Sequence, residues 1–260
     1  MTGAERAFDK FATDFDALFS RSLTGQRNKV RKLLKRMTPA EFPNVLELNC
    51  GTGEDAKWLL EKGHQVTATD ISSGMIEIAR RKPSGVEFYR ADMRNLKSVL
   101  PGRKFNLIFS NFGGLNCVSP SDLLKISADA ASLLEPGGKM LLIIMGRNCR
   151  WERFYFRRKK QPEHAVRRLD LGPVTAVING NAFPVWYYSP REFENAFSAE
   201  FEVLSKKPIG LFLPPSYLDS WFIKRKFLLH LLSGLETLFS FQNFADDADH
   251  YAIELIKRKS

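Results

Sequence analysis

The sequence predicts an α/β protein built around a doubly wound parallel sheet. Between residues 44 and 146, short apolar runs alternate with amphipathic stretches, which is typical of strand–helix–strand units. A glycine-rich segment follows the first apolar run, and Asp70 ends the second. Of the 260 residues 44% are hydrophobic, enough for one sizeable core, so intrinsic disorder and disulfide-stapled miniproteins are excluded.

Five strands joined by four crossovers are expected in this region. The strands are expected at 45–48, 65–69, 86–89, 105–109 and 139–145. Helices are expected at 54–62, from Gly74 to the residue before Pro83, and from Pro120 to about 134. Serines that precede the second and third helices favour N-caps there, because a serine hydroxyl accepts from free backbone amides.

After residue 147 the alternation breaks down. One or two strands are expected within 173–188, followed by a helix to about 197 that Ser189, Pro190 and Glu192 open with capping-box spacing. Further strands are expected at 201–206 and 250–256. An insertion of about 40 residues, 209–247, separates them and is long enough to suggest a function. Seven of its large residues share one helical stripe: Phe227, Leu228, Leu231, Leu232, Leu235, Leu238 and Phe239.

Composition limits the possible partners and location. The formal net charge is +10, and nine cations against two carboxylates give the segment 147–168 a local charge of +7. Such a segment attracts phosphate-rich partners, an anionic membrane or an acidic substrate, or else serves as a solvated face. No apolar run is long enough to span a membrane and no signal peptide is visible. Cys50, Cys117 and Cys149 lack zinc or CxxC spacing, which favours free thiols in the cytoplasm.

The segment Glu47-Leu48-Asn49-Cys50-Gly51-Thr52-Gly53 is the most informative part of the chain. It lies where a strand passes into a helix, and glycines there let backbone amides approach a ligand closely. Seventeen residues after Gly53, Asp70 takes the position from which a carboxylate reaches a ribose diol. No histidine has metal-ligand spacing, so no metal is expected.

Five motifs in order resemble those of the class I S-adenosylmethionine-dependent methyltransferases, and of their small-molecule members in particular. The first is the glycine segment, which resembles E/D-x-G-x-G-x-G with Asn49 in place of the first glycine. Asp70-Ile71 resembles the ribose-binding motif and Ala91-Asp92-Met93 the adenine site. The segments 105–111 and 134–139 are similar to the motifs of the fourth strand and of the approach to the fifth.

The resemblance implies a Rossmann-like sheet of seven strands in the order 3-2-1-4-5-7-6, with the last strand antiparallel. It also implies S-adenosylmethionine as cofactor. The residues expected to bind it are Phe15, Glu47, Asn49, Cys50, Gly51, Gly53, Asp70, Ile71, Met75, Asp92, Met93, Asn111 and Phe112. Phe15 alternatively belongs to a packed helical stripe with Phe8 and Phe11. Asn111-Phe112-Gly113-Gly114 departs from the N/D-P-P-Y motif, which argues against methylation of nucleic-acid bases of that type.

On this basis we expect four regions: an N-terminal helical cap (1–43), a cofactor-binding core (44–146), a basic and aromatic substrate-cap insertion (147–188), and a C-terminal completion of the sheet (189–260). The lid at 209–247 belongs to the last of these. It would close over the acceptor or, through a helix near Lys224-Arg225-Lys226, contact a membrane surface. The acceptor is expected to contact Trp186, Tyr187, Tyr188 and Arg191, which otherwise are ordinary core residues.

The favoured function is methyl transfer by in-line displacement to a small-molecule or lipid-like acceptor. No catalytic base is identified. An RNA or protein methyltransferase that uses the basic segment 147–168 is a less favoured alternative. A non-catalytic cofactor-binding or interaction protein and a true NAD-dependent Rossmann enzyme are the others. The oligomeric state is not predicted.

Overall fold

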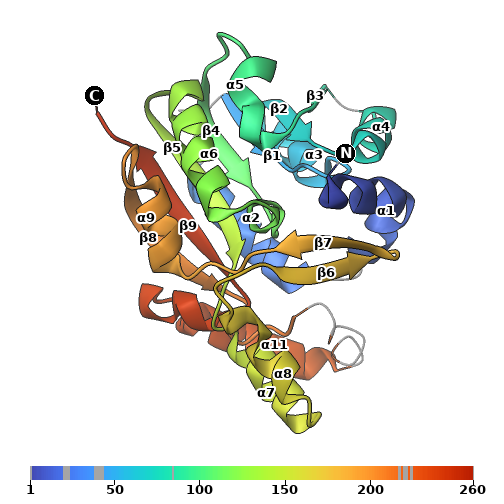
Figure 1. Ribbon diagram of the computed structural model, residues 1–260. Coiled ribbons are helices and arrows are strands. Elements are labelled where there is room, and N and C mark those ends of the chain that lie inside the picture. Colours follow the sequence, from blue (N-terminus) through green and yellow to red (C-terminus); the bar gives the residue numbers. More distant parts are fainter. Residues whose placement is uncertain are drawn as a thin grey trace.

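The computed structural model describes residues 2–19, 24–37, 44–83, 85–215, 218, 222 and 225–259 (Figure 1). The strands of the large sheet are β1 Asn44–Leu48, β2 Gln65–Asp70, β3 Glu87–Arg90, β4 Phe105–Ser110, β5 Leu134–Met145, β8 Phe201–Ile209 and β9 His250–Lys257. A separate hairpin comprises β6 Val174–Ile178 and β7 Asn181–Val185. The α-helices are α1 Gly3–Phe19, α2 Thr24–Met37, α3 Glu54–Glu61, α4 Ser73–Arg81, α5 Leu96–Val99, α6 Pro120–Leu133, α7 Arg150–Arg158, α8 Pro162–Val166, α9 Pro190–Phe197 and α11 Lys226–Leu238. Short 3-10 turns lie at Met93–Asn95, Gly114–Cys117, Arg167–Leu169 and Gln242–Asp247.

The large sheet has the strand order β3-β2-β1-β4-β5-β9-β8, which confirms the predicted fold class and order. β1 to β5 run parallel, and β9 runs antiparallel to both β5 and β8. The order reverses between β1 and β4. In open α/β sheets the crevice at such a switch point, beyond the carboxyl ends of the strands, is where ligands bind.

Helices cover both faces of the sheet, and each face has its own core. Leu48, Ile108 and Leu142 point to one face, where they meet α5, α6 and α9. Val45 and Leu107 point to the other face and meet α2, α3 and α4. Alternate residues of one strand therefore enter different cores, which explains why these strands are apolar throughout.

The predicted capping signals form as hydrogen bonds. The Ser72 hydroxyl accepts from the Met75 amide at 3.1 Å and caps α4. Ser119 with Asp122, and Ser189 with Glu192, make reciprocal capping boxes at the starts of α6 and α9. In both helices a proline follows the capping serine. The capping box and the proline, all within four residues, are therefore enough to fix where these helices begin.

The two N-terminal helices have different places in the fold. Helix α1 lies between the β6–β7 hairpin and α4, with the rings of Phe8 and Phe183 at 5.7 Å. Helix α2 instead packs Val30 and Leu34 against the sheet face. Of these two helices, α1 is the one that lies over the carboxyl edge of the sheet. The 173–188 segment, expected to hold one or two strands, forms the hairpin that supports α1 rather than part of the large sheet.

The apolar stripe of helix α11 is largely exposed to solvent. None of the seven residues of its apolar stripe is buried, and Phe227, Leu231 and Leu238 are 85%, 53% and 68% exposed. These three side chains therefore do not pack against the sheet. Lys224 lies outside the described residues. Among the parts of the chain that are described, no helix is long and apolar enough to cross a membrane.

Candidate functional site

The glycine loop between β1 and α3 has the backbone conformation that its sequence requires. Asn49, Gly51 and Gly53 have positive φ angles of 47°, 55° and 79°, a region that glycine adopts readily and asparagine tolerates. A Cβ atom on Gly53 would lie 2.8 Å from the Phe88 ring, and one on Gly51 would lie 3.1 Å from the Phe15 ring. The loop therefore has room for backbone only, and Phe15 of α1 lies directly over it.

Asp70, at the end of β2, holds this loop in place. Its Oδ2 accepts from the Gly51 amide at 2.8 Å and its Oδ1 from the Ser72 amide at 2.9 Å. Burial raises the pKa of Asp70, while these backbone hydrogen bonds oppose the rise. The carboxylate thus has both a structural role and a position beside the loop where it can accept hydrogen bonds from a ligand.

The side chain of Asn49, which stands where the motif has a glycine, links two strand ends. Its side chain donates to the Asn111 carbonyl at 2.8 Å and accepts from the Ser110 hydroxyl at 2.6 Å, joining the ends of β1 and β4. A Cβ atom on Gly114 would lie 2.1 Å from the Asn49 side chain. A side chain at 49 is accommodated because residue 114 has none.

Glu47 carries a buried carboxylate without a full set of partners. Its side chain is 2% exposed, and its Oε2 atom has no hydrogen-bond partner among the described residues. Burial first, and then the neighbouring Asp55 charge, raise the pKa of Glu47 well above its ordinary value. An unpaired buried carboxylate is costly. A cationic group, such as the ammonium of an amino acid, would supply the missing partner.

Asp55 links Asn111, at the end of β4, to Arg31 of α2. The Asn111 amide donates to Asp55 Oδ2 at 2.7 Å, and Arg31 pairs with Asp55 at 2.9 Å. Asp55 comes directly after the glycine loop, in the first turn of α3. The sequence analysis did not single out Asp55, because an acidic residue at a helix start is already explained by the helix dipole.

An open hollow of about 700 Å³ adjoins Asp70 at the ends of β2 and β3. The residues lining it include two of the predicted ones, Ile71 and Asp92, together with Glu5 and Arg90. Arg94 binds both oxygens of Asp92. Although burial acts to raise it, these hydrogen bonds hold the pKa of Asp92 below its ordinary value. Met93 packs on the neighbouring core.

Three acidic residues of α1 fasten this helix over the site. Glu5 pairs with Arg90 at 2.6 Å, and Asp9 accepts from the Gly74 amide at 3.0 Å. Asp16 accepts from the Thr52 hydroxyl and pairs with Lys82. The sequence analysis missed these residues, although their i, i+4, i+11 spacing places them on one helix face. Met75 is buried at the first turn of α4, beside this contact.

A histidine–aspartate pair lies at the other end of the same edge. His250 is opposite Met145 in the register, at the carboxyl end of β5, and its ring centroid is 5.2 Å from that of Phe112. Phe112 has a φ of 35° and follows Asn111 directly. His250 Nδ1 is 3.2 Å from Asp249 Oδ2, within ion-pair distance but without hydrogen-bond geometry. Nε2 makes no hydrogen bond within the described part of the chain.

The pair rests on a buried ionic cluster. Arg168, 7% exposed, pairs with Glu152 and with Asp249, each at 2.8 Å, and its guanidinium lies 4.8 Å from the Tyr187 ring centroid. Although burial acts to raise it, His250 and Arg168 hold the pKa of Asp249 well below its ordinary value. Arg167 adds a second bond to Glu152 at 2.7 Å. Two cations of the basic segment, Arg167 and Arg168, are therefore paired with carboxylates inside the protein.

The four residues expected to contact the acceptor occupy different environments. Tyr187 lies in the ionic cluster, while Tyr188 is 3% exposed and donates its hydroxyl to the Val118 carbonyl at 2.6 Å. Burial raises the pKa of Tyr188. Trp186 is half-buried and bonds through its backbone to Asn116, and Arg191 is exposed on α9. Their contact with an acceptor stays a prediction.

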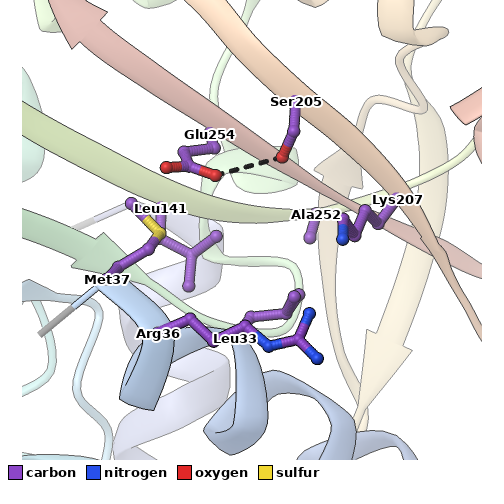
Figure 2. A pocket seen from close by; sticks show the side chains of 8 residues that line it. All are labelled: Leu33, Arg36, Met37, Leu141, Ser205, Lys207, Ala252 and Glu254. Carbon is purple, nitrogen blue, oxygen red and sulfur yellow. Dashed lines mark hydrogen bonds between the residues drawn. The ribbon is translucent and has the colours of Figure 1, made fainter.

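A second cavity, of about 150 Å³, lies between α2 and the sheet (Figure 2). Leu33, Arg36 and Met37 line it from the helix, and Ser205 and Glu254, hydrogen-bonded at 3.1 Å, from the strands. These strand residues are in the middle of β8 and β9, on the face of the sheet that α2 covers. The cavity is separate from the carboxyl edge. In the described residues no three His, Cys, Asp or Glu side chains converge as a metal site would require.

Comparison with known proteins identifies the central part of the chain. Residues 45–138 match the family model described as a methyltransferase domain. The malonyl-[acyl-carrier protein] O-methyltransferase of Enterobacter lignolyticus is 27% identical over 60% of this chain, and the demethylmenaquinone methyltransferase of Clavibacter sepedonicus is 30% identical over 52%. The chain spans 60% and 55% of the lengths of these curated relatives.

One solved structure resembles nearly the whole chain. It is the Burkholderia thailandensis 1,6-didemethyltoxoflavin-N1-methyltransferase with bound 1,6-didemethyltoxoflavin and S-adenosylhomocysteine. The TM-score is 0.60 at 15% identity, over 99% of this chain and 88% of that one. At this identity the likeness concerns the fold. The match extends beyond the family model to α1, the hairpin and the C-terminal strands.

Proposed function

We propose that the chain is a class I S-adenosylmethionine-dependent methyltransferase that transfers the methyl group of its cofactor to a small-molecule or lipid-like acceptor. The observation that carries this proposal is the unpaired buried carboxylate of Glu47 beside a glycine loop that Asp70 holds. An amino acid joined to a nucleoside would place an ammonium group next to Glu47 and ribose hydroxyls next to Asp70. The relatives named for malonyl-carrier and menaquinone substrates support an acceptor of this class.

The residues present fit this cofactor at three points. Glu47 Oε2 would accept from the amino group, relieving the cost of an unpaired charge. Asp70 would accept from the ribose hydroxyls next to Gly51, and the hollow lined by Ile71 and Asp92 would take the adenine. Phe15 covers the loop from α1. Cys50 is buried with a raised pKa, which suits a small side chain beside the ligand rather than a nucleophile.

S-adenosylmethionine supplies a methyl group activated by a sulfonium, so the protein needs chiefly to align the two reactants. Helix α1, which packs on the β6–β7 hairpin and on α4, lies over the edge where the two reactants would be aligned. Positioning of this kind is worth up to roughly 7–11 kcal/mol of the barrier. The acceptor would enter near Phe112, at the end of the edge remote from the adenine hollow.

His250 is the group that we assign to the acceptor's proton. Asp249 approaches Nδ1, which leaves Nε2 to accept a proton as the acceptor atom bonds to the methyl group. His250→Gln should lower kcat by about 10²-fold or more, the usual contribution of a general base. The affinity for S-adenosylmethionine should change less than about twofold. His164→Gln, which removes an exposed histidine from α8, is the control.

Initial rates and calorimetry with both variants decide this assignment. A His250→Gln enzyme with the parent kcat would show that the acceptor needs no base from this residue. A fall in cofactor affinity that equals the fall in rate would place His250 in the cofactor site instead.

Transfer of a radiolabelled methyl group to separate fractions of lipid extract, RNA and protein tests the acceptor class. We expect label in the lipid or small-molecule fraction. Of the nine cations in the basic segment, Arg147, Arg150, Arg167 and Arg168 pair with carboxylates inside the protein. Label in RNA or protein, with a steep salt dependence, would favour the alternative acceptors.

We also propose that the protein works in the reducing cytoplasm. Cys50, Cys117 and Cys149 are free thiols. Burial raises the pKa of Cys117 and of Cys149 to about 12. Three thiols without a disulfide among them suit a compartment that keeps thiols reduced.

A further inference from the structure

Helix α11 has a buried carboxylate on its inner side and its most exposed apolar side chains on the outer side. Glu236 is 2% exposed; it accepts from the backbone amides of Gly210 and Phe212 and pairs with Lys29 at 2.8 Å. Phe227 and Leu231 precede Glu236 by nine and five residues, which places them about 180° and about 140° around the helix from it. An amphipathic helix of a soluble domain normally has the reverse arrangement.

The outward side carries several large exposed side chains. On α11 it comprises Phe227, Leu231 and Leu238, at helical spacings of four and eleven residues. Phe239 and Phe241, 38% and 63% exposed, continue it beyond the end of the helix. An exposed apolar group of this size on one element marks an interaction surface.

A group of exposed cations lies on the neighbouring helix α7. Arg157, Arg158, Lys159 and Lys160 end it, and no carboxylate pairs with any of them in the described ranges of the chain. The Arg158 guanidinium lies 5.7 Å from the ring centroid of Phe154, which is itself 57% exposed. An ordinary solvated surface carries charged side chains without exposed aromatic rings. Here the cations lie beside a ring whose exposure to water is unfavourable.

The two groups belong to the same end of the molecule. Figure 1 shows α7, α8 and α11 together below the sheet. Trp151 of α7 packs edge-on against Phe222 at 5.8 Å, and Arg150 pairs with Asp247 at 2.6 Å, so α7 contacts the insertion that carries α11. We call the outward residues of α11 with Phe239 and Phe241, together with Phe154 and residues 157–160, the basic apolar face.

We propose that the basic apolar face docks on an anionic lipid membrane. Apolar side chains on one helix would enter the acyl boundary, and the long cationic side chains would reach the phosphates of the headgroups. An acidic protein would satisfy the cations but would leave outward-pointing phenylalanines and leucines without an apolar phase. The cations match the phosphates of an anionic bilayer, and the outward apolar side chains match its acyl region. Both features therefore favour a bilayer.

Docking would bring the membrane close to the acceptor end of the site. Glu236 holds Gly210, whose carbonyl accepts from the Asp249 amide at 3.2 Å, next to His250. The delivery of a lipid-like acceptor from the bilayer rests on the proposed function. The docking itself does not, and it can be measured without cofactor or acceptor.

Co-sedimentation of the full chain with vesicles tests the docking. We expect binding to vesicles of phosphatidylcholine with phosphatidylglycerol, at least tenfold weaker binding to phosphatidylcholine alone, and loss of binding in high salt. Leu231→Lys with Leu238→Lys should reduce binding at least tenfold, and Lys159→Glu with Lys160→Glu should do the same. Circular dichroism and thermal unfolding verify that the variants are folded.

Matched controls separate this face from general surface chemistry. Leu124→Lys replaces a leucine on α6 that is 58% exposed, and Lys62→Glu with Lys97→Glu makes the same charge change on other elements. Both controls should bind vesicles as the parent does. If they lose binding equally, the effect is general and the proposal is wrong.

Three other results would overturn the proposal. The parent protein fails to co-sediment with anionic vesicles, or it binds a purified acidic protein instead. Alternatively, analytical ultracentrifugation without lipid shows a dimer that Leu231→Lys with Leu238→Lys dissociates, which would mean that a second copy covers the face. Failure of methyl transfer with intact vesicle binding would contradict only the proposed function.

Discussion

Replacing Arg168 with methionine is expected to lower the free energy of unfolding by about 3–5 kcal/mol. The substitution keeps the apolar stem but leaves Glu152 and Asp249 without their common cation, and their side chains are only 2% and 4% exposed. A buried charge that loses its partner keeps the full cost of desolvation. Urea denaturation of the parent and the variant at neutral pH measures the difference.

The matched control is Arg258→Met, which removes an ion pair to Glu202 at the surface. Both side chains there are about half exposed, so the loss should stay below about 1 kcal/mol. The folded pKa of Asp249 lies below its unfolded value, so its contribution is present above about pH 4 and is lost as the pH falls toward the folded pKa. A loss below about 1 kcal/mol for Arg168→Met would contradict the structural role given to this cluster.

Asp70→Asn should weaken the binding of S-adenosylmethionine by about tenfold to more than a hundredfold. The substitution removes the charge that would accept from the ribose, and hydrogen bonds to charged groups contribute about 1.5–3 kcal/mol. Asparagine retains one acceptor oxygen, which can serve only one of the two backbone amides, Gly51 or Ser72, so one loop hydrogen bond is also lost. Asp70→Ala would remove both acceptors, so it would also destabilise the loop.

Isothermal titration calorimetry at neutral pH measures the affinity of this variant. Glu61→Gln, which removes one exposed carboxylate from the end of α3, controls for the change of net charge. If Asp70→Asn is folded and binds as tightly as the parent, Asp70 has only the structural role in the loop.

The fold was predictable because its signals are local. Alternating apolar runs, the capping serines and the turn glycines each depend on a few neighbouring residues, and the strands and helices of the central sheet lie within a few residues of where these signals place them. The order of the strands is not local. It came from the motifs and their family resemblance, and the structure has the expected order.

The places of the candidate site residues were predictable where one segment of the sequence contains them. Glu47, Gly51 and Asp70 follow from strand ends and spacing. The pairing of Glu5 with Arg90, or of Arg168 with Asp249, joins residues about 80 positions apart, and no local pattern predicts such contacts. The position of His250 beside Phe112 depends likewise on the antiparallel pairing of β9 with β5.

Helix α11 shows the limit of periodicity most clearly. The spacing of its leucines predicts a helix with one apolar face, and the helix forms. Periodicity does not say whether that face turns inward. The direction is set by Glu236, whose bonds to the backbone of the turn after β8 fix the opposite face against the protein.

We expect Glu47 and the glycine loop to bind the amino-acid end of S-adenosylmethionine. In the cofactor-free protein the pKa of Glu47 is raised, so ionisation lowers the stability of the fold as the pH rises from about 4 through the folded pKa. Glu47→Gln removes this cost. The variant should therefore be at least as stable as the parent at neutral pH, although it lacks the charge that would bind an ammonium.

The most direct test is a calorimetric titration of the parent and of Glu47→Gln with S-adenosylmethionine and with NAD, accompanied by thermal unfolding of both proteins without ligand. We predict that the parent binds S-adenosylmethionine and not NAD, and that Glu47→Gln binds it at least tenfold more weakly while unfolding at the same or a higher temperature. Equal affinity of the two proteins for S-adenosylmethionine, or tighter binding of NAD by the parent, would contradict the claim.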